Sequence, residues 1–437
     1  MSDAVSPIEV VITGLGIVSP IGIGTEEFTS ALKAGRSGIS PCRIWPDIAS
    51  PDHVAGEVKG FTDETAKKVY LKSLRKNLKA MCREIQLGVA SAHMAVENSG
   101  LDLTAIDHGR LGIEFGANLM LSEPEILSEP SVAAKDEADK FVFSRWTTNG
   151  LPKMEPLWLL RYLPNMPACH IGISLDCRGP SNSLTMDDAS GGVVLGEAQR
   201  ILQRGAADIM ITGCTGTTMH PIKTLHQALW RDLAKSPAEP EKRARPFDLN
   251  RDGRVVGEGA ATCLLETRAH AEARGAQIIG RLLGTGSSCV SSRDGKPNYR
   301  QALANAMKAA LRSAGKTPEQ IGHINAHGLG TPEGDILEAQ AIYDVFGEEL
   351  GRKIPVTAPK SFLANSGAGS GMLELATSLV ALREGFIPAT LNYETPDPAC
   401  PLNVVAGQPL ATTNRVFLTV NVTRAGQASA AVVEALV

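Results

Sequence analysis

Short apolar runs rich in β-branched residues alternate with amphipathic helical runs along most of this 437-residue chain. Such alternation predicts an α/β architecture in which sheets are buried between layers of helices. The expected strands are residues 9–12, 111–115, 208–212, 261–265, 323–325 and 416–421. The expected helices are residues 25–34, 78–97, 191–204, 299–314, 334–346 and 372–384, most of which end near a glycine.

The composition is that of an ordinary large globular protein, with 43 % hydrophobic and 21 % charged residues. A formal net charge of −4 and an aromatic content of 4 % argue against a nucleic-acid-binding surface. No apolar run approaches the ~20 residues that cross a membrane, and the chain starts almost directly with a strand instead of a signal segment. We therefore expect a cytoplasmic protein without a membrane span.

The cysteines and two glycine-containing motifs give no sign of a metal or a cofactor. The eight cysteines are scattered without close pairs or metal-ligand spacing, which is typical of reduced thiols in a cytoplasmic protein. Gly14-x-Gly16 follows a strand but lacks the third glycine of a dinucleotide site. Residues 248–259 begin like a calcium-binding loop, but the twelfth position is Gly259 instead of a bidentate glutamate. We expect neither a metal nor a cofactor.

Residues 179–196 (GPSNSLTMDDASGGVVLG) are the most informative segment, because a strand there turns sharply into a helix. Residues 183–186 are predicted to end a buried strand, and apolar residues recur at helical spacing from Ala189 until Gly205. The positive end of a helix dipole favours an anion, and a cysteine at such a turn becomes a thiolate nucleophile. In this chain the position holds Asp188.

Five landmarks in a fixed order support a family resemblance. They are VVITGLGIVSPIG (10–22), Asn165-Met166-Pro167, the segment from Gly179-Pro180-Ser181 to Ser190-Gly191, RPFDLNRDGRVVGEGAA (245–261) and NAHGLGTPEGD (325–335). Together they resemble the β-ketoacyl-acyl carrier protein synthases, the elongating condensing enzymes of fatty-acid and polyketide assembly. The resemblance implies the thiolase fold, with two related α/β halves in a five-layer αβαβα sandwich. We place these halves at residues 1–266 and 267–437, with a cap or insertion at about 121–156 in the first.

The resemblance also implies which residues form the site. The nucleophilic cysteine of the family falls on Asp188, its first histidine on His327 and its second histidine on Asn365. The gating phenylalanine of the family falls on Ala425. The expected supporting residues are Lys360, Glu374, Asp335, Arg424 and Ala425, and the residues expected along the pantetheine arm are Thr331 and Leu329.

The aspartate at position 188 determines the expected activity. A condensing enzyme moves an acyl group from one thioester to another, which is nearly isoenergetic. A carboxylate would instead form an acid anhydride, which is strongly uphill, and it is a weaker nucleophile than a thiolate. A negative charge at Asp188 would also disfavour a malonyl carboxylate nearby. We therefore predict that this chain does not condense acyl groups alone.

Several interpretations of the site stay open from the sequence. Asp188 or its neighbour Asp187 is a helix cap, or Asp188 forms a carboxylate–imidazole dyad with His327 that acts as a general base. Arg424 could instead neutralise Asp188 as an ion pair. A His327–Asn365 pair would stabilise an enolate after malonyl decarboxylation, and an oxyanion hole would use the backbone N–H groups of Asp188 and Ala425.

Three functions remain compatible with these residues. The chain is a partner of an active sister synthase, like the chain-length factors that also lack the cysteine. Alternatively it is an enzyme with altered chemistry, such as decarboxylation, hydrolysis, cyclisation or dehydration through Asp188 and His327. Or it is a self-associating acyl-binding scaffold. The resemblance implies acyl carrier protein as a partner, substrates carried on its phosphopantetheine, and a homodimer or a heterodimer with a cysteine-bearing sister.

Overall fold

The computed structural model describes residues 8–42, 53–230, 232–235 and 238–437. Its centre is a mixed sheet of 12 strands in the order β13-β11-β10-β15-β16-β9-β1-β8-β7-β5-β6, with β2 attached to β1. The strands are β1 (Val10–Ser19), β2 (Gly22–Ile23), β5 (Leu111–Ala117), β6 (Ser181–Leu184), β7 (Ile209–Thr217), β8 (Glu258–Thr267), β9 (Gly280–Cys289), β10 (His323–Asn325), β11 (Pro355–Thr357), β13 (Asn403–Val404), β15 (Val416–Val422) and β16 (Gln427–Ala435). Two small sheets pair β3 (Ile39–Pro41) with β4 (Val54–Gly56) and β12 (Phe386–Ile387) with β14 (Leu410–Ala411).

The large sheet consists of two halves built in the same way. In one half β8 lies antiparallel between β1 and β7, and β5 and β6 follow in parallel. In the other half β16 lies antiparallel between β9 and β15, and β10 and β11 follow in parallel. A short antiparallel pairing of β1 with β9 joins them. This repeated pattern confirms the prediction of two related α/β halves.

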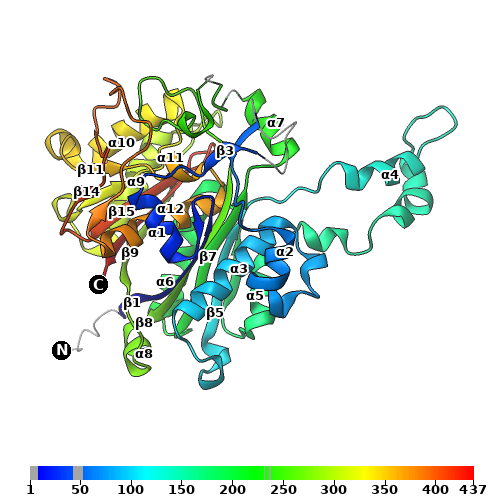
Figure 1. The fold of residues 1–437 in the computed structure, drawn as a ribbon, viewed down its shortest axis with the longest axis horizontal. Helices are drawn as coiled ribbons and strands as arrows, with labels where there is room; N and C mark the ends of the chain where they lie inside the picture. The colour runs from blue at the N-terminus through cyan, green and yellow to red at the C-terminus, as the bar shows by residue number, and fades with distance from the viewer. Residues whose placement is uncertain (1–7, 43–52, 231, 236–237) are drawn as a thin grey trace.

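Helices form the other layers (Figure 1). α6 (Ser190–Gln203) and α12 (Ala368–Arg383) pack against each other and against strands of both halves of the sheet. α3 (Arg83–Asn98) and α5 (Met166–Leu175) cover the outer face of one half, while α9 (Tyr299–Ala314), with α10 (Pro332–Gly351) against it, covers the other. α12 is buried over residues 368–382, which explains why it is apolar all round instead of amphipathic.

The remaining helices lie around these layers. They are α1 (Thr25–Lys33), α2 (Asp63–Thr65), α4 (Glu125–Ala133), α7 (Pro221–Leu229), α8 (Arg268–Ala273) and α11 (Lys360–Leu363). The segment that contains α4 extends away from the sheet layers as an arm (Figure 1). No helix in the described part of the chain is long and apolar enough to cross a membrane.

All the predicted helices and strands are found, several of them longer than predicted, such as β1 and β7. Two predictions are wrong in kind. Residues 183–186 do not end a buried strand, because β6 ends at Leu184 and lies exposed or half-buried at the edge of the sheet. The helix expected from residue 78 begins at Arg83. A separate 3-10 turn, Leu78–Ala80, precedes it, and Met81 has extended backbone angles that interrupt the helix. Hydrophobic periodicity continues through such a turn, so it does not reveal the break.

Candidate active site

A cavity of about 740 Å³, called the chamber below, opens where the turn before α6 faces the loops after β10 and β15. Five of the predicted site residues line it, namely Asp188, His327, Leu329, Thr331 and Arg424. Asn365, Lys360 and Glu374 are buried behind the wall and reach the lining residues through hydrogen bonds. The structure therefore brings most of the predicted site together.

Asp188 lies in a 3-10 turn, Asp187–Ala189, immediately before α6. Its side chain is 3 % exposed, and its Oδ1 atom accepts a hydrogen bond of 2.6 Å from the Asn365 amide. In the described residues the N-cap positions of this turn and of α6 are Met186 and Ala189, and neither makes a side-chain cap. Asp188 thus occupies neither cap position, whereas the Asp187 carboxylate accepts from the backbone N–H of Asp188. The Asp188 carboxylate is fixed instead by a side chain from the loop before α12.

The neighbouring Asp187 has a different environment. Its backbone is left-handed, with φ of 46°, and its side chain is exposed to the chamber. The surrounding protein and the charge of Asp188 raise the pKa of the Asp187 carboxyl, although Arg254 and Lys223 oppose the shift. The two adjacent carboxylates thus differ in environment. Asp188 is held in the wall by Asn365, whereas Asp187 is exposed to the chamber.

His327 is held in a defined tautomer. Its Nδ1 atom faces two donors, the Lys360 ammonium at 3.1 Å and the Asn421 amide at 3.4 Å. Nδ1 must therefore accept, and the ring hydrogen lies on Nε2. Burial, together with the positive charges of Lys360 and Arg254, lowers the pKa of His327 well below its ordinary value. At neutral pH this ring is a hydrogen-bond donor at Nε2, not a base.

The support for His327 is a buried network. Lys360 donates to the Glu374 carboxylate at 2.5 Å and to the His327 carbonyl at 2.8 Å, and Asn421 donates to Glu374 at 2.7 Å. Burial raises the pKa of Glu374 to about 7, although Lys360 and Asn421 lower it. The network fixes both the ring and the backbone of His327.

Two carboxylates of α10 hold the loop that carries His327. Asp335 accepts hydrogen bonds from the N–H groups of Phe247 (2.8 Å) and Gly330 (3.0 Å). Glu338 accepts from the N–H groups of His327 (2.7 Å) and Gly328 (2.8 Å). Burial raises the pKa of Asp335 to about 6 and that of Glu338 to about 8. Asp335 was predicted as a supporting residue, whereas Glu338 was not, although its position one turn later on the same helix indicates the same role.

Two predicted contacts are absent. Among the residues that the structure describes, no hydrogen bond joins Asp188 to His327, so the proposed base dyad is wrong. Arg424 does not pair with Asp188 either. It forms an ion pair with Asp232 at 2.6 Å and lies over the Trp230 ring at 4.6 Å, and both of these residues also line the chamber.

Two further residues differ from the predicted site, Ala425 in the loop after β15 and Arg254 in the segment before β8. Ala425 is exposed and is not among the chamber's lining residues, so the structure does not bring it to Asp188 as the oxyanion-hole prediction requires. Arg254 does line the chamber, pairs with Asp232 at 3.4 Å and acts electrostatically on His327. Arg254 lies within the RPFDLNRDGRVVGEGAA motif, but no role was predicted for it.

The chamber offers no evident metal site. In the described parts of the chain, no three His, Cys, Asp or Glu side chains are grouped so that they could hold a metal ion.

The carboxylates of the calcium-like loop, residues 248–259, accept hydrogen bonds from backbone N–H groups. Asp248 accepts from the N–H groups of Asn250, Glu394 and Thr395, and Asp252 accepts from that of Lys235. These bonds fasten the loop to its neighbours.

Known proteins of one family match this chain along most of its length. The family model "Beta-ketoacyl synthase, N-terminal domain" matches residues 8–271, and "Beta-ketoacyl synthase, C-terminal domain" matches residues 279–394. The 3-oxoacyl-[acyl-carrier-protein] synthase 2 of Coxiella burnetii is 34 % identical over 400 residues, which cover 91 % of this chain and 92 % of that protein. The corresponding synthase of Vibrio cholerae is 32 % identical over 402 residues, or 91 % of each chain.

Solved structures show the same fold. The ishigamide ketosynthase/chain length factor matches with a TM-score of 0.85 at 29 % identity, covering 99 % of this chain and 100 % of that one. A beta-ketoacyl synthase from Burkholderia phymatum matches with a TM-score of 0.84 at 26 % identity, covering 98 % and 100 %. The predicted thiolase-type fold is thereby confirmed. On its fold, its site and these matches, the chain belongs to the beta-ketoacyl synthase family.

Proposed function

We propose that this chain is a non-condensing beta-ketoacyl synthase homologue that binds acyl carrier protein and works beside a cysteine-bearing sister synthase, in the manner of a chain-length factor. The observation that carries the proposal is Asp188, a buried carboxylate at the turn where the family motif has its nucleophile. Asn365 holds this carboxylate in place at 2.6 Å, so the position is built around an aspartate.

The chemistry of the chamber supports a loss of condensation. None of the chamber's lining residues, all in the described part of the chain, is a cysteine. Cys177, which lies before the turn, has a thiol pKa raised to about 12 by burial and by Asp176, and a thiol of this kind is a poor nucleophile. A carboxylate that accepted an acyl group would form an anhydride, which is strongly uphill from a thioester.

Other residues that line or support the chamber favour the binding of a ligand. We assign His327 as a hydrogen-bond donor to a ligand oxygen, with Lys360, Glu374 and Asp335 as positioning residues. Thr331 and Leu329 line the same chamber and are the proposed contacts of a pantetheine arm. The ishigamide structure, whose name joins a ketosynthase with a chain length factor, motivates the choice of a heterodimeric partner role.

One observation favours a second candidate, an enzyme with altered chemistry. The chamber is open, and Asp187 and the Nε2 side of His327 both belong to it. Since His327 is neutral and donates from Nε2, malonyl decarboxylation with His327 stabilising the enolate fits better than hydrolysis with His327 as the base.

A single experiment tests both candidates. The chain, its sister synthase and their co-expressed complex are each incubated with malonyl- and acyl-loaded carrier protein, and products are read by intact mass. The proposal expects condensation from the complex or the sister, an effect of this chain on product length, and no condensation by this chain alone. Condensation by this chain alone would refute it. Loss of CO₂ from malonyl carrier protein, abolished in Asp188→Ala or His327→Ala, would establish the second candidate.

A further inference from the structure

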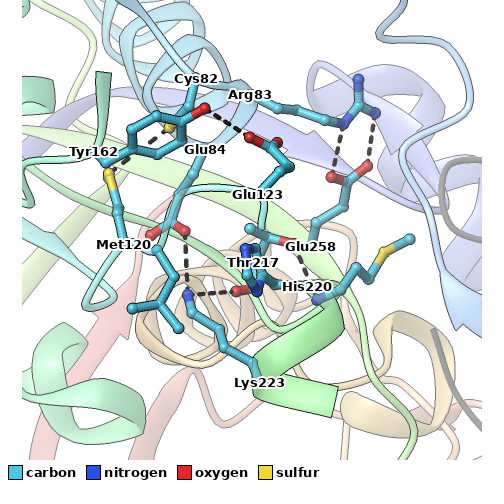
Figure 2. Close-up of a pocket in the computed structure, with 12 residues that line it drawn as sticks. Cys82, Arg83, Glu84, Met120, Glu123, Tyr162, Thr217, His220, Lys223 and Glu258 are labelled. Atoms are coloured by element: carbon cyan, nitrogen blue, oxygen red, sulfur yellow. Dashed lines mark hydrogen bonds and ion pairs between the residues drawn. The ribbon is translucent and has the colours of Figure 1, made fainter. Parts of the chain in front are cut away.

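A second cavity, of about 110 Å³, lies outside the chamber and shares none of its lining residues (Figure 2). The start of α3, the segment after β5, the end of β7 and the first turn of α7 surround it. Its walls carry several ionisable side chains that the proposed function does not use. The cavity therefore requires its own explanation.

His220 provides an unpartnered donor in this cavity. It is the N-cap of α7, and its Nδ1 atom accepts the Ile222 N–H at 3.2 Å, so the ring hydrogen lies on Nε2. His220 is 7 % exposed, and its buried Nε2 has no hydrogen-bond partner in the described structure. The Ser122 carbonyl acts on the ring but completes no hydrogen bond to Nε2. A buried N–H group without an acceptor is unfavourable, so a ligand that accepts from it is stabilised.

Lys223 adds a positive charge one turn further along the same helix. Its ammonium donates to the Thr217 carbonyl at 3.1 Å and forms an ion pair with the Glu84 carboxylate at 3.7 Å (Figure 2). An ammonium has three hydrogens, so it retains donor capacity toward the cavity. His220, Lys223 and the N-terminus of the nine-residue helix α7 all favour an anion at the same wall.

The acidic residues around the cavity already have partners. Arg83 binds Glu258 through two nitrogens, at 2.6 and 2.7 Å, and the Tyr162 hydroxyl donates to Glu123 at 2.6 Å (Figure 2). Glu84 accepts the Asn118 N–H at 2.9 Å. These contacts reduce the repulsion that an incoming anion would meet, whereas the donors of α7 stay available.

The rest of the lining is apolar and rich in sulfur. Cys82, Met120, Leu121 and Met219 form this part of the wall, and the Cys82 thiol lies 3.8 Å from the Met120 sulfur. An anion with a short apolar tail matches both walls, whereas a phosphate would leave the apolar wall without a partner. We propose that this cavity binds the carboxylate of a short-chain aliphatic acid, with His220 and Lys223 as the donors.

Butyrate, with six non-hydrogen atoms, is the probe. Its affinity for the full-length protein is measured by saturation-transfer NMR, beside butyramide, inorganic phosphate and the thioester of succinic acid with N-acetylcysteamine. Butyrate is expected to bind at least about tenfold more tightly than its neutral isostere butyramide and than phosphate. If the succinyl thioester binds more tightly than butyrate, the ligand is the carboxylate end of a longer chain. If butyrate binds more tightly than the succinyl thioester, the ligand is the free acid. Equal binding of butyrate and butyramide would overturn the proposal.

The variants are chosen so that the fold is kept. His220→Asn retains a helix cap but cannot reach the position of Nε2, and Lys223→Met keeps the side-chain length without the charge. Each is expected to weaken butyrate binding roughly tenfold, while Lys308→Met, an exposed lysine of α9, should not change it. Because Lys223→Met leaves Glu84 unpaired, the double variant Glu84→Gln/Lys223→Met controls for misfolding. Unchanged butyrate affinity in all these folded variants would refute the assignment.

An independent readout is the pH dependence of binding. Burial raises the pKa of Glu84 to about 7, with Lys223 as the facing charge. A carboxylate bound nearby favours the protonated form of Glu84, so affinity should rise as the pH falls from 8 to 6. Burial raises the pKa of Cys82 to about 12, so this thiol does not titrate in the range, and burial lowers the pKa of His220. Glu84→Gln should remove the pH dependence, and a wild-type affinity that falls from pH 8 to 6 would contradict the proposal. None of these results bears on condensation.

Discussion

The contact between Asp188 and Asn365 links two of the positions that the sequence analysis assigned to the cysteine and second histidine of the family. A hydrogen bond to a charged group is roughly twice as strong as one between neutral groups. Asn365 donates to Asp188 at 2.6 Å, and its own Oδ1 accepts the Gly367 N–H at 3.2 Å. The amide is thus oriented toward the carboxylate instead of standing free beside His327. This hydrogen bond couples the side chains at positions 188 and 365 to each other.

The assignment of Asp188 to the nucleophile position can be tested by restoring the thiol. Asp188→Cys places a thiol at the start of α6, where the helix N-terminus lowers its pKa. We expect this variant to take up one acyl group from an acyl thioester in intact-mass measurements, above the level of the wild type and of Asp188→Ala. Asp187→Cys is the matched control for the position. Acylation of Asp187→Cys without acylation of Asp188→Cys would show that the proposed correspondence is displaced by one residue.

At the scale of elements, strands and helices with strong periodicity were predictable, and their interruptions were not. β10 and α9 have the predicted bounds, because each is a continuous apolar or amphipathic run. The exposure of β6 could not be predicted, since a position at the edge of a sheet is decided by topology and not by the strand's own residues. His327 and Lys360 were grouped correctly through their motifs. The roles of Glu338 and Arg254 depend on contacts across loops that no local pattern encodes.

Gly16 shows how a glycine that resembles part of a nucleotide motif serves packing between elements. It lies inside β1, and a Cβ atom there would overlap the Ser91 carbonyl of α3. Because the Ser91 carbonyl belongs to the backbone of α3, it cannot move away from the added Cβ without a shift of the helix. We expect Gly16→Ala to lower the free energy of unfolding by about 3 kcal/mol in urea denaturation.

Gly60→Ala is the matched control for this substitution. Its Cβ would lie 3.3 Å from the terminal carbon of Ile23, a flexible group that can shift. This control should change the free energy of unfolding by no more than about 0.5 kcal/mol. Equal stability of the two variants would show that α3 and β1 are not packed as closely as the structure has them.

For the whole molecule, the buried carboxyl groups set how stability depends on pH. Burial raises the pKa of Glu114 and Glu374 to about 7 and that of Glu338 to about 8. In the unfolded chain these groups ionise near their ordinary pKa, so between pH 6 and 8 they bind more protons in the folded state than in the unfolded state. Their contribution to stability should therefore fall as the pH rises through this window, while buried histidines with a lowered pKa, such as His323 and His327, act in the opposite direction.

Glu114 offers the clearest single test of this dependence. It lies on β5 with no exposed surface, and within the described structure neither carboxylate oxygen has a hydrogen-bond partner. Ionisation of one such group between pH 6 and 8 costs the folded state about 1 kcal/mol. Glu114→Gln should therefore reduce the loss of stability between these pH values by about that amount, measured by urea denaturation at one protein concentration so that association does not differ. An exposed carboxylate treated in the same way, Glu349→Gln, should leave the loss unchanged. If Glu114→Gln loses as much stability between pH 6 and 8 as the wild type, Glu114 does not carry the raised pKa that its packing implies.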